Sequence, residues 1–291
     1  MFAFVPPRER GIEGDHSMSR ERELKEIAGD LRRYYEFQKE MGVKRVFRER
    51  KEESAGDRRE TEYPRREETV TPKRTVARED RGAAPNEEII SVPEQMGMFD
   101  SSSKIMPLEE IRKELMERMS SRLFEGSKQI VFGEGNPKAR LVFVGEAPGR
   151  DEDIQGRPFV GRAGQLLNKI IEAMGLKRED VYISNIVKSR PPDNRTPTPD
   201  EMAEWEPFLF QELRSINPDV VVCLGNTASQ SILKTKASLG SMRGKFHRYG
   251  KFKVMVTYHP AALLRNPNFK KPLWEDMQHV MKELGISRPG D

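Results

Sequence analysis

The stretch that most limits the fold is residues 141–164, LVFVGEAPGRDEDIQGRPFVGRAG, in which an apolar run leads into two glycine-containing turns. The run from Leu141 to Val144 predicts a buried strand. Gly145 and Gly149 follow it, and glycine permits backbone angles and close approaches that a Cβ atom would forbid. In α/β proteins, such a strand and turn before a helix often carry a binding site. A plain connection between strand and helix would use the same glycines, so this pattern leaves both interpretations open.

Three further apolar runs predict strands, at 181–187, 220–225 and 253–258. Amphipathic patterns between and around the runs predict helices over 107–120, 161–175, Asp200 to about Asn217, from Asn226 onward and over 271–284. The Pro-rich and Asn-rich stretch 189–199 predicts a loop. Strands that alternate with helices predict a three-layer α/β/α domain with a four-stranded, mostly parallel central sheet.

The charged residues are unevenly spread along the chain. They make up 34% of the sequence, and residues 48–91 consist largely of Arg, Glu, Pro and Thr. Such a stretch cannot bury enough apolar surface to become ordered, so we expect a disordered linker. The predicted organisation is a segment 1–47 with a charged amphipathic helix over 18–41, a linker 48–105 and a globular domain 106–291. We therefore expect the N-terminal tail that precedes the globular domain to be largely disordered.

The remaining totals exclude some classes of protein. One cysteine, Cys223, allows no disulfide framework and no thiolate metal cluster, which fits a reducing cytoplasm. No apolar run reaches the length of a membrane span, and the N-terminal sequence is too short and too soon charged for a signal peptide. The net charge of +4 suits a polyanionic partner without proving one.

Polar residues follow each predicted strand. Glu146 and its glycine turn follow the first, Asn185 lies within the second, Asn226 follows the third and His259 the fourth. Each could be structural when taken singly. Because ligands on open α/β sheets bind beyond the carboxyl ends of the strands, their convergence, together with Phe159, favours a functional site.

Six ordered motifs between residues 107 and 284 resemble the family 4 uracil-DNA glycosylases of bacteria and archaea. These motifs are VFGEGNP (131–137), GEAPGRDED (145–153), GRPFVGRAGQLLN (156–168), YISNIVKSRPPDNRTPTP (182–199), VVCLGNTA (221–228) and HPAALLRNP (259–267). The resemblance implies the fold of these glycosylases, DNA containing uracil as substrate, and a monofunctional hydrolase that begins base-excision repair. It also implies a prokaryotic enzyme of the cytoplasm, associated with the nucleoid and active as a monomer, whose chemistry needs no nucleotide or metal cofactor.

The resemblance assigns roles to the candidate residues. Phe159 would stack on the extruded base, and the Asn185 amide would donate to uracil O4 and accept from N3–H, a pattern that rejects cytosine. His259 would donate to O2 as the glycosidic bond breaks. The substrate-binding turn would consist of Gly145, Ala147, Pro148 and Gly149.

Two carboxylate positions could orient the attacking water. Many uracil glycosylases carry an Asp where this chain has Ala147. Glu146 is the preferred alternative and could also crowd out the methyl group of thymine, whereas the pair Glu152 and Asp153 could be merely solvated.

Several residues are predicted to contact other macromolecules. Leu263 and Leu264 would form an apolar wedge in DNA, and the contacts to phosphates or the groove would come from Pro191, Arg243, Lys245 and Arg265. The segment 93–100 resembles the short peptide by which bacterial DNA enzymes bind the sliding clamp, through Gln95, Met98 and Phe99.

The chain departs from the family at four cysteines that usually hold a [4Fe–4S] cluster. Those positions are occupied here by Arg118, Ser121, Ser189 and Trp205. None of these residues is a cluster ligand, so we expect no cluster and expect Trp205 to fill part of the vacated space. The loss leaves a second hypothesis open, a catalytically degenerate module that binds damaged DNA and recruits partners. A nucleotide-binding flavodoxin-like domain is disfavoured, because acidic residues follow the glycine turn and would repel phosphate.

Overall fold

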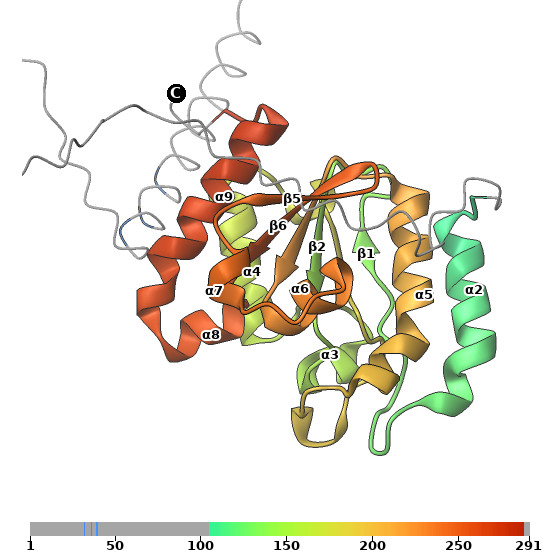
Figure 1. Cartoon of the computed structure of the whole chain (residues 1–291). Helices are drawn as coiled ribbons and strands as arrows, with labels where there is room; N and C mark the ends of the chain where they lie inside the picture. The colour runs from blue at the N-terminus through green and yellow to red at the C-terminus, as the bar shows by residue number, and fades with distance from the viewer. Residues whose placement is uncertain (1–31, 33–35, 37–38, 40–104, 288–291) are drawn as a thin grey trace, which may run out of the picture. The chain divides into compact units, whose positions relative to one another are not determined.

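The computed structural model describes residues 105–287 and, before them, Arg32, Glu36 and Lys39 (Figure 1). These three earlier residues are helical, and they lie in the stretch where the charged helix is predicted. The linker and the segment 93–100 lie outside the described residues, so both remain predictions. No helix in the described part of the chain is long and apolar enough to cross a membrane.

A mixed six-stranded sheet forms the centre of the domain (Figure 1), with the strand order β1-β3-β2-β4-β6-β5. Its strands are β1 (Glu134–Gly135), β2 (Leu141–Gly145), β3 (Tyr182–Asn185), β4 (Val220–Leu224), β5 (Phe246–Tyr249) and β6 (Phe252–Thr257). The central strands β3, β2, β4 and β6 are parallel, and the edge strands β1 and β5 are antiparallel to their neighbours. The α/β fold is confirmed, whereas the predicted count of four strands is corrected to six.

Helices cover both faces of this sheet. The described helices are α2 (Leu108–Met119), α3 (Arg150–Gln155), α4 (Arg162–Ala173), α5 (Pro199–Ile216), α6 (Asn226–Leu233), α7 (Leu239–Met242), α8 (Pro260–Arg265) and α9 (Lys270–Leu284). One hydrophobic cluster joins one face of the sheet to α2, α5 and α6, and a second joins the other face to α4, α8 and α9. Alternate residues of each central strand enter opposite clusters, which explains why these strands are apolar throughout.

The start of α5 differs from the prediction. The sequence predicts a helix that begins with Asp200 as its cap, whereas α5 begins at Pro199 and Thr198 caps it. Its hydroxyl accepts the N–H of Glu201 at 3.3 Å, and the Glu201 carboxylate accepts the N–H of Thr198 at 2.7 Å. This reciprocal pair is a capping box, which satisfies two backbone donors that a single Asp cap would not.

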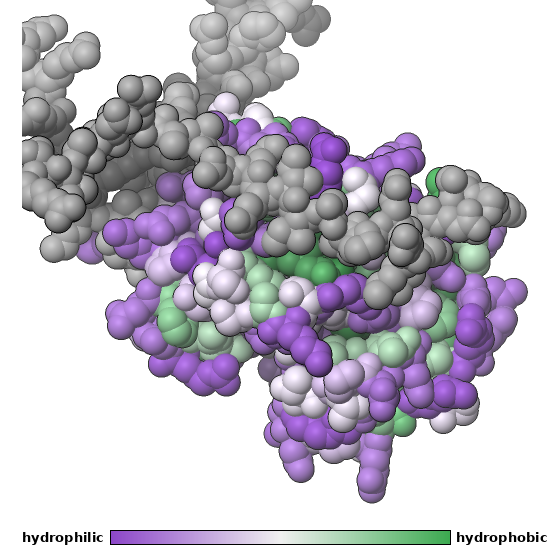
Figure 2. Space-filling model, viewed as in Figure 1, coloured by the Kyte–Doolittle hydropathy of each residue, from purple (hydrophilic) through white to green (hydrophobic). Residues whose placement is uncertain are grey.

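The parallel strands direct their carboxyl ends to one edge of the sheet. Gly145 at the end of β2 pairs in register with Asn185 at the end of β3, and Leu224 of β4 pairs with Thr257 of β6, two residues before His259. The polar residues predicted at strand ends therefore meet at this edge. On the face shown in Figure 2, hydrophilic side chains predominate around the periphery of the described part, as its many charged residues require.

Candidate active site

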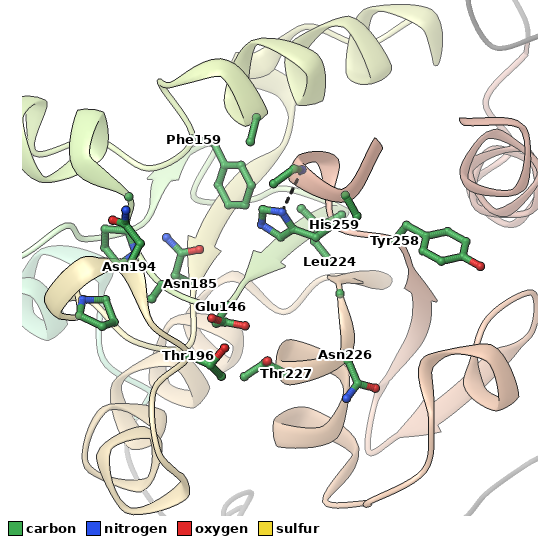
Figure 3. A pocket seen from close by; sticks show the side chains of 18 of the residues that line it. Glu146, Phe159, Asn185, Asn194, Thr196, Leu224, Asn226, Thr227, Tyr258 and His259 are labelled. Carbon is green, nitrogen blue, oxygen red and sulfur yellow. Dashed lines mark hydrogen bonds between the residues drawn. The ribbon is translucent and has the colours of Figure 1, made fainter. Parts of the chain in front are cut away.

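A cavity of about 550 Å³ lies at the carboxyl ends of the parallel strands (Figure 3). The predicted site residues that line it are Glu146, Ala147, Pro148, Gly149, Phe159, Asn185 and His259. Gly145 lies directly behind them, since a Cβ atom there would come within 2.4 Å of Asn185 Oδ1 and 2.6 Å of Phe159 Cζ. The structure thus brings the aromatic ring, the amide and the imidazole to one cavity, and Gly145 must lack a side chain for them to fit.

Asn185 presents a buried amide to this cavity. Its side chain is only 2% exposed, and among the described residues its Oδ1 atom has no hydrogen-bond partner. A buried acceptor left without a donor carries a free-energy cost, so such groups usually have a function or a missing partner. The Asn185 Oδ1 atom is therefore placed to accept a hydrogen bond from a bound ligand.

Phe159 adopts a backbone conformation that is rare for a residue with a side chain. Its φ angle is +51°, and its ring is 5% exposed with a centroid 5.6 Å from that of His259. In Figure 3 the ring of Phe159 lies beside the imidazole of His259 at the cavity. A left-handed conformation outside glycine costs about 1–3 kcal/mol, and it persists only when surrounding contacts hold it.

His259 caps helix α8 through its ring. The N–H of Ala261 donates to His259 Nδ1 at 3.1 Å, drawn as the dashed line in Figure 3. Because Nδ1 accepts this bond, the proton of the neutral ring lies on Nε2, which is then a donor. Burial is the main cause that lowers the pKa of His259 from 6.5 to about 4, and the charge of Arg265 lowers it further. The imidazole is therefore neutral at physiological pH.

This tautomer predicts a flat pH dependence of catalysis. Above its pKa of about 4 the ring is neutral, whereas below it a proton on Nδ1 would face the N–H of Ala261. We therefore expect kcat/KM to stay constant from pH 8 down to about pH 5 and to fall only as the pH approaches 4. The profile is measured by single-turnover assays in buffers of constant ionic strength. A decline centred on the ordinary value near 6.5 would contradict it.

The candidate carboxylates have different environments. Glu146 is half-buried, lines the cavity near Asn185 (Figure 3), and receives no hydrogen bond at its carboxylate within the described residues. Asp153 is buried and accepts bonds from the Ser127 hydroxyl at 3.0 Å and from the N–H of Lys128 at 2.8 Å. The Asp153 carboxylate therefore holds a loop, whereas that of Glu146 faces the cavity.

Glu152 also has a structural task. One of its oxygens accepts the N–H groups of Val160 and Gly161, each at 2.9 Å. The side chain reaches the cavity wall, yet its charge is directed at the backbone that follows Phe159. The interpretation of Glu152 and Asp153 as solvated acids is therefore wrong, because both accept hydrogen bonds within the fold.

The structure places some of the predicted DNA contacts at the cavity and others away from it. Pro191 and Arg265 line the cavity, and Leu264 on α8 is 43% exposed. Leu263 is buried at 1% exposure in the core, which corrects the expectation that it contributes to a wedge.

The other two basic residues, Arg243 and Lys245, lie between α7 and β5. The Arg243 guanidinium binds Asp276 at 3.0 Å and the carbonyl of Pro272 at 2.7 Å, so internal partners already engage it. Lys245 lies in the turn between α7 and β5. Their contact with phosphates stays a prediction.

The four residues predicted to occupy the positions of the iron–sulfur ligands lie in different environments. Ser189 Oγ accepts the N–H of Phe124 at 3.0 Å, and Trp205 is 1% exposed with its ring centroid 6.4 Å from that of Phe124. Arg118 binds Glu114 at 2.6 Å, and Ser121 is exposed. No thiolate is present among them, so these residues do not fit a [4Fe–4S] cluster.

The fold and this site define a class of protein. Residues 132–278 match the model of the uracil DNA glycosylase superfamily, and the chain belongs to that superfamily. Similar proteins are type-4 uracil-DNA glycosylases. The one from Archaeoglobus fulgidus is 42% identical over 190 residues, which cover 62% of this chain and 96% of the relative. The one from Saccharolobus solfataricus is 45% identical over 192 residues, 62% and 88% of the two chains. The one from Thermotoga maritima is 49% identical over 165 residues, 53% and 86% of the two chains.

Proposed function

We propose that this chain is a uracil-DNA glycosylase that hydrolyses the N-glycosidic bond of deoxyuridine in DNA, releasing uracil and leaving an abasic site. The observation that carries the proposal is the convergence of Phe159, Asn185 and His259 on one cavity. The similarity to type-4 uracil-DNA glycosylases supports the same activity. The chemistry of each residue then follows from its position.

Recognition depends on the ring and the amide. The target nucleotide must leave the base stack to reach a cavity at the sheet edge. Phe159 stacks on the extruded pyrimidine, and Asn185 Oδ1, which has no partner within the described residues, accepts from uracil N3–H. The Asn185 amide N–H donates to O4. Cytosine presents the opposite donor and acceptor at these positions, so it would leave buried groups unpaired.

Bond cleavage places negative charge on the departing uracil. As the bond from C1′ to N1 breaks, the electron pair stays with uracil and the charge spreads to O2. His259 Nε2–H and the N–H groups of the turn 145–149 donate to this oxygen, which lowers the barrier because they are already in place. Water then adds to C1′: one of its protons stays on the new 1′-hydroxyl group, and the other neutralises the released uracil anion. We assign the orientation of this water to Glu146, whose carboxylate faces the cavity without another partner in the described part of the chain.

A cleavage assay tests this function. The protein is incubated with an oligonucleotide that contains one uracil, and alkali then breaks the strand at any abasic site. We expect strand cleavage by the wild type and none with the matched thymine oligonucleotide. Tight binding of the uracil strand without cleavage would instead support the non-enzymatic module.

We also propose that the active protein contains no iron–sulfur cluster. The support is the chemistry of the four positions, where Arg118, Ser121, Ser189 and Trp205 provide no thiolate and Trp205 is buried against Phe124. We expect protein purified without oxygen to contain no stoichiometric iron and to show no absorbance near 400 nm, with full glycosylase activity. Iron measurement and a visible spectrum check this. An activity that depends on added iron and sulfide would contradict it.

Docking on the sliding clamp through Gln95, Met98 and Phe99 and a monomeric state remain predictions. The three residues lie outside the described residues, and neither the fold nor the comparisons bear on them.

A further inference from the structure

Arg178 lies behind the ring of Phe159, and no sequence motif indicates a role for it. It belongs to the short helical turn Arg178–Asp180 between α4 and β3. Its guanidinium donates to the carbonyl of Pro158 at 2.6 Å and to the carbonyl of Phe159 at 3.2 Å. It also donates to Asn168 Oδ1 at 2.8 Å. These bonds engage the two peptide carbonyls that bracket the unusual backbone of Phe159.

The same segment is held on its other side by Glu152. The carboxylate of Glu152 accepts the next two amide groups along the chain, those of Val160 and Gly161. Carbonyls that point toward a guanidinium and amides that point toward a carboxylate fix the orientation of successive peptide planes. A left-handed φ of +51° at Phe159 can then persist without glycine.

Close packing leaves this segment little freedom to shift. A Cβ atom at position 164 would come within 1.9 Å of the carbonyl oxygen of Phe159, so the start of α4 can approach only because residue 164 is glycine. The Arg178 side chain is 21% exposed, and its charge is balanced by Glu134 at 3.4 Å. The guanidinium is thus fixed by its own partners before a ligand arrives.

We propose that Arg178 is a positioning residue for base recognition: it fixes the left-handed backbone of Phe159 and so holds the ring where the extruded uracil stacks. This inference rests on the proposed function. Arg178 does not line the cavity, so it acts on the base only through Phe159. A planar fork of donors can satisfy two carbonyls and an amide oxygen at once, which a lysine cannot reproduce.

The test is a double-mutant cycle on uracil-containing DNA. We expect Arg178→Ala to raise KM about tenfold and to lower kcat less, because stacking stabilises bound substrate and transition state alike. In a Phe159→Ala background the same substitution should change KM by less than about twofold, since the ring through which it acts is gone. Arg178→Lys should give an intermediate KM.

Arg157→Ala is the matched control. Arg157 also binds Glu134, at 2.7 Å, yet it is exposed, and no bond from it to the segment of Phe159 is present in the described part of the chain. We expect its KM to stay within about twofold of the wild type. If Arg178→Ala does not fold, Arg178→Gln, which can still donate to one carbonyl, replaces it in the cycle.

The outcomes separate this inference from the proposed function. A lower melting temperature with an unchanged KM would assign Arg178 a purely structural role and overturn the inference, and so would an equal rise in KM with and without Phe159. Both results would leave the glycosylase activity standing. A wild-type protein that does not cleave uracil DNA would overturn the proposed function and this inference with it.

Discussion

Replacing His259 with alanine should lower kcat for uracil release by about 10²–10³-fold. The physical reason is that the neutral ring holds its Nε2 proton toward the cavity, as the bond from the Ala261 N–H to Nδ1 requires. A donor fixed in place gains strength as charge develops on the leaving group and needs no rearrangement at that moment. The loss should appear in kcat more than in KM, because the substrate carbonyl carries little charge before the bond breaks.

His259→Asn separates this role from the capping of α8. An asparagine at the N-cap of a helix can accept the N–H of a residue two or three positions later, so the cap and the fold should survive. The shorter amide cannot place a donor where Nε2 lies. We therefore expect the melting temperature to stay near that of the wild type and kcat to fall as far as in His259→Ala. Retention of activity within tenfold in His259→Asn would contradict the assignment of the imidazole as the donor to O2.

The central strands were predictable from sequence because each one is buried on both sides. Leu141–Gly145 and Val220–Leu224 are continuous apolar runs, and parallel strands covered by helices require this. The edge strands lack such a signal. Glu134–Gly135 has two residues, and Phe246–Tyr249 contains a basic residue and a histidine, so neither stands out from a loop.

The residues at strand ends were predictable for the same reason, since the ends of parallel strands meet at one edge. The internal contacts of Arg178 and Arg243 were not, because they depend on partners that only the folded chain brings near. Arg243 looks like a surface residue in its loop, and it binds Asp276, 33 positions later. Arg178 binds carbonyl groups, which no side-chain pattern records.

The hydrogen-bond partners of the acidic residues were also not predictable from local sequence, although some of these partners lie nearer in the chain. Residues 150–155 are rich in acids, a composition typical of a solvated turn, whereas they form helix α3 with Asp153 buried. Glu152 on this helix accepts amide groups eight and nine residues further along. Local charge density predicts solvation, yet the chain after Gly156 returns to the helix and brings two amide donors to the Glu152 carboxylate.

Asn185→Asp should lower kcat/KM for uracil by about 10³-fold or more. The amide donates to O4 through its nitrogen and accepts from N3–H through Oδ1, whereas an ionised carboxylate can only accept. The substitution therefore places a negative oxygen against uracil O4 at a residue that is only 2% exposed. Two hydrogen-bond acceptors that face each other in a buried site repel, and this costs more free energy than the loss of one hydrogen bond. Asn185→Ala, which removes both contacts without repulsion, should lose less activity.

The same substitution should reduce the preference for uracil over cytosine. A carboxylate can accept from the amino group of cytosine, so the contact that excludes this base becomes favourable in Asn185→Asp. Asn226→Asp is the matched control, because Asn226 lines the same cavity and its side chain points away from Asn185 in Figure 3. It adds the same charge near the DNA without changing the amide. Single-turnover rates on matched uracil and cytosine oligonucleotides measure both effects. An equal loss of uracil activity in both variants would show that charge alone is responsible, and that the amide does not read the base.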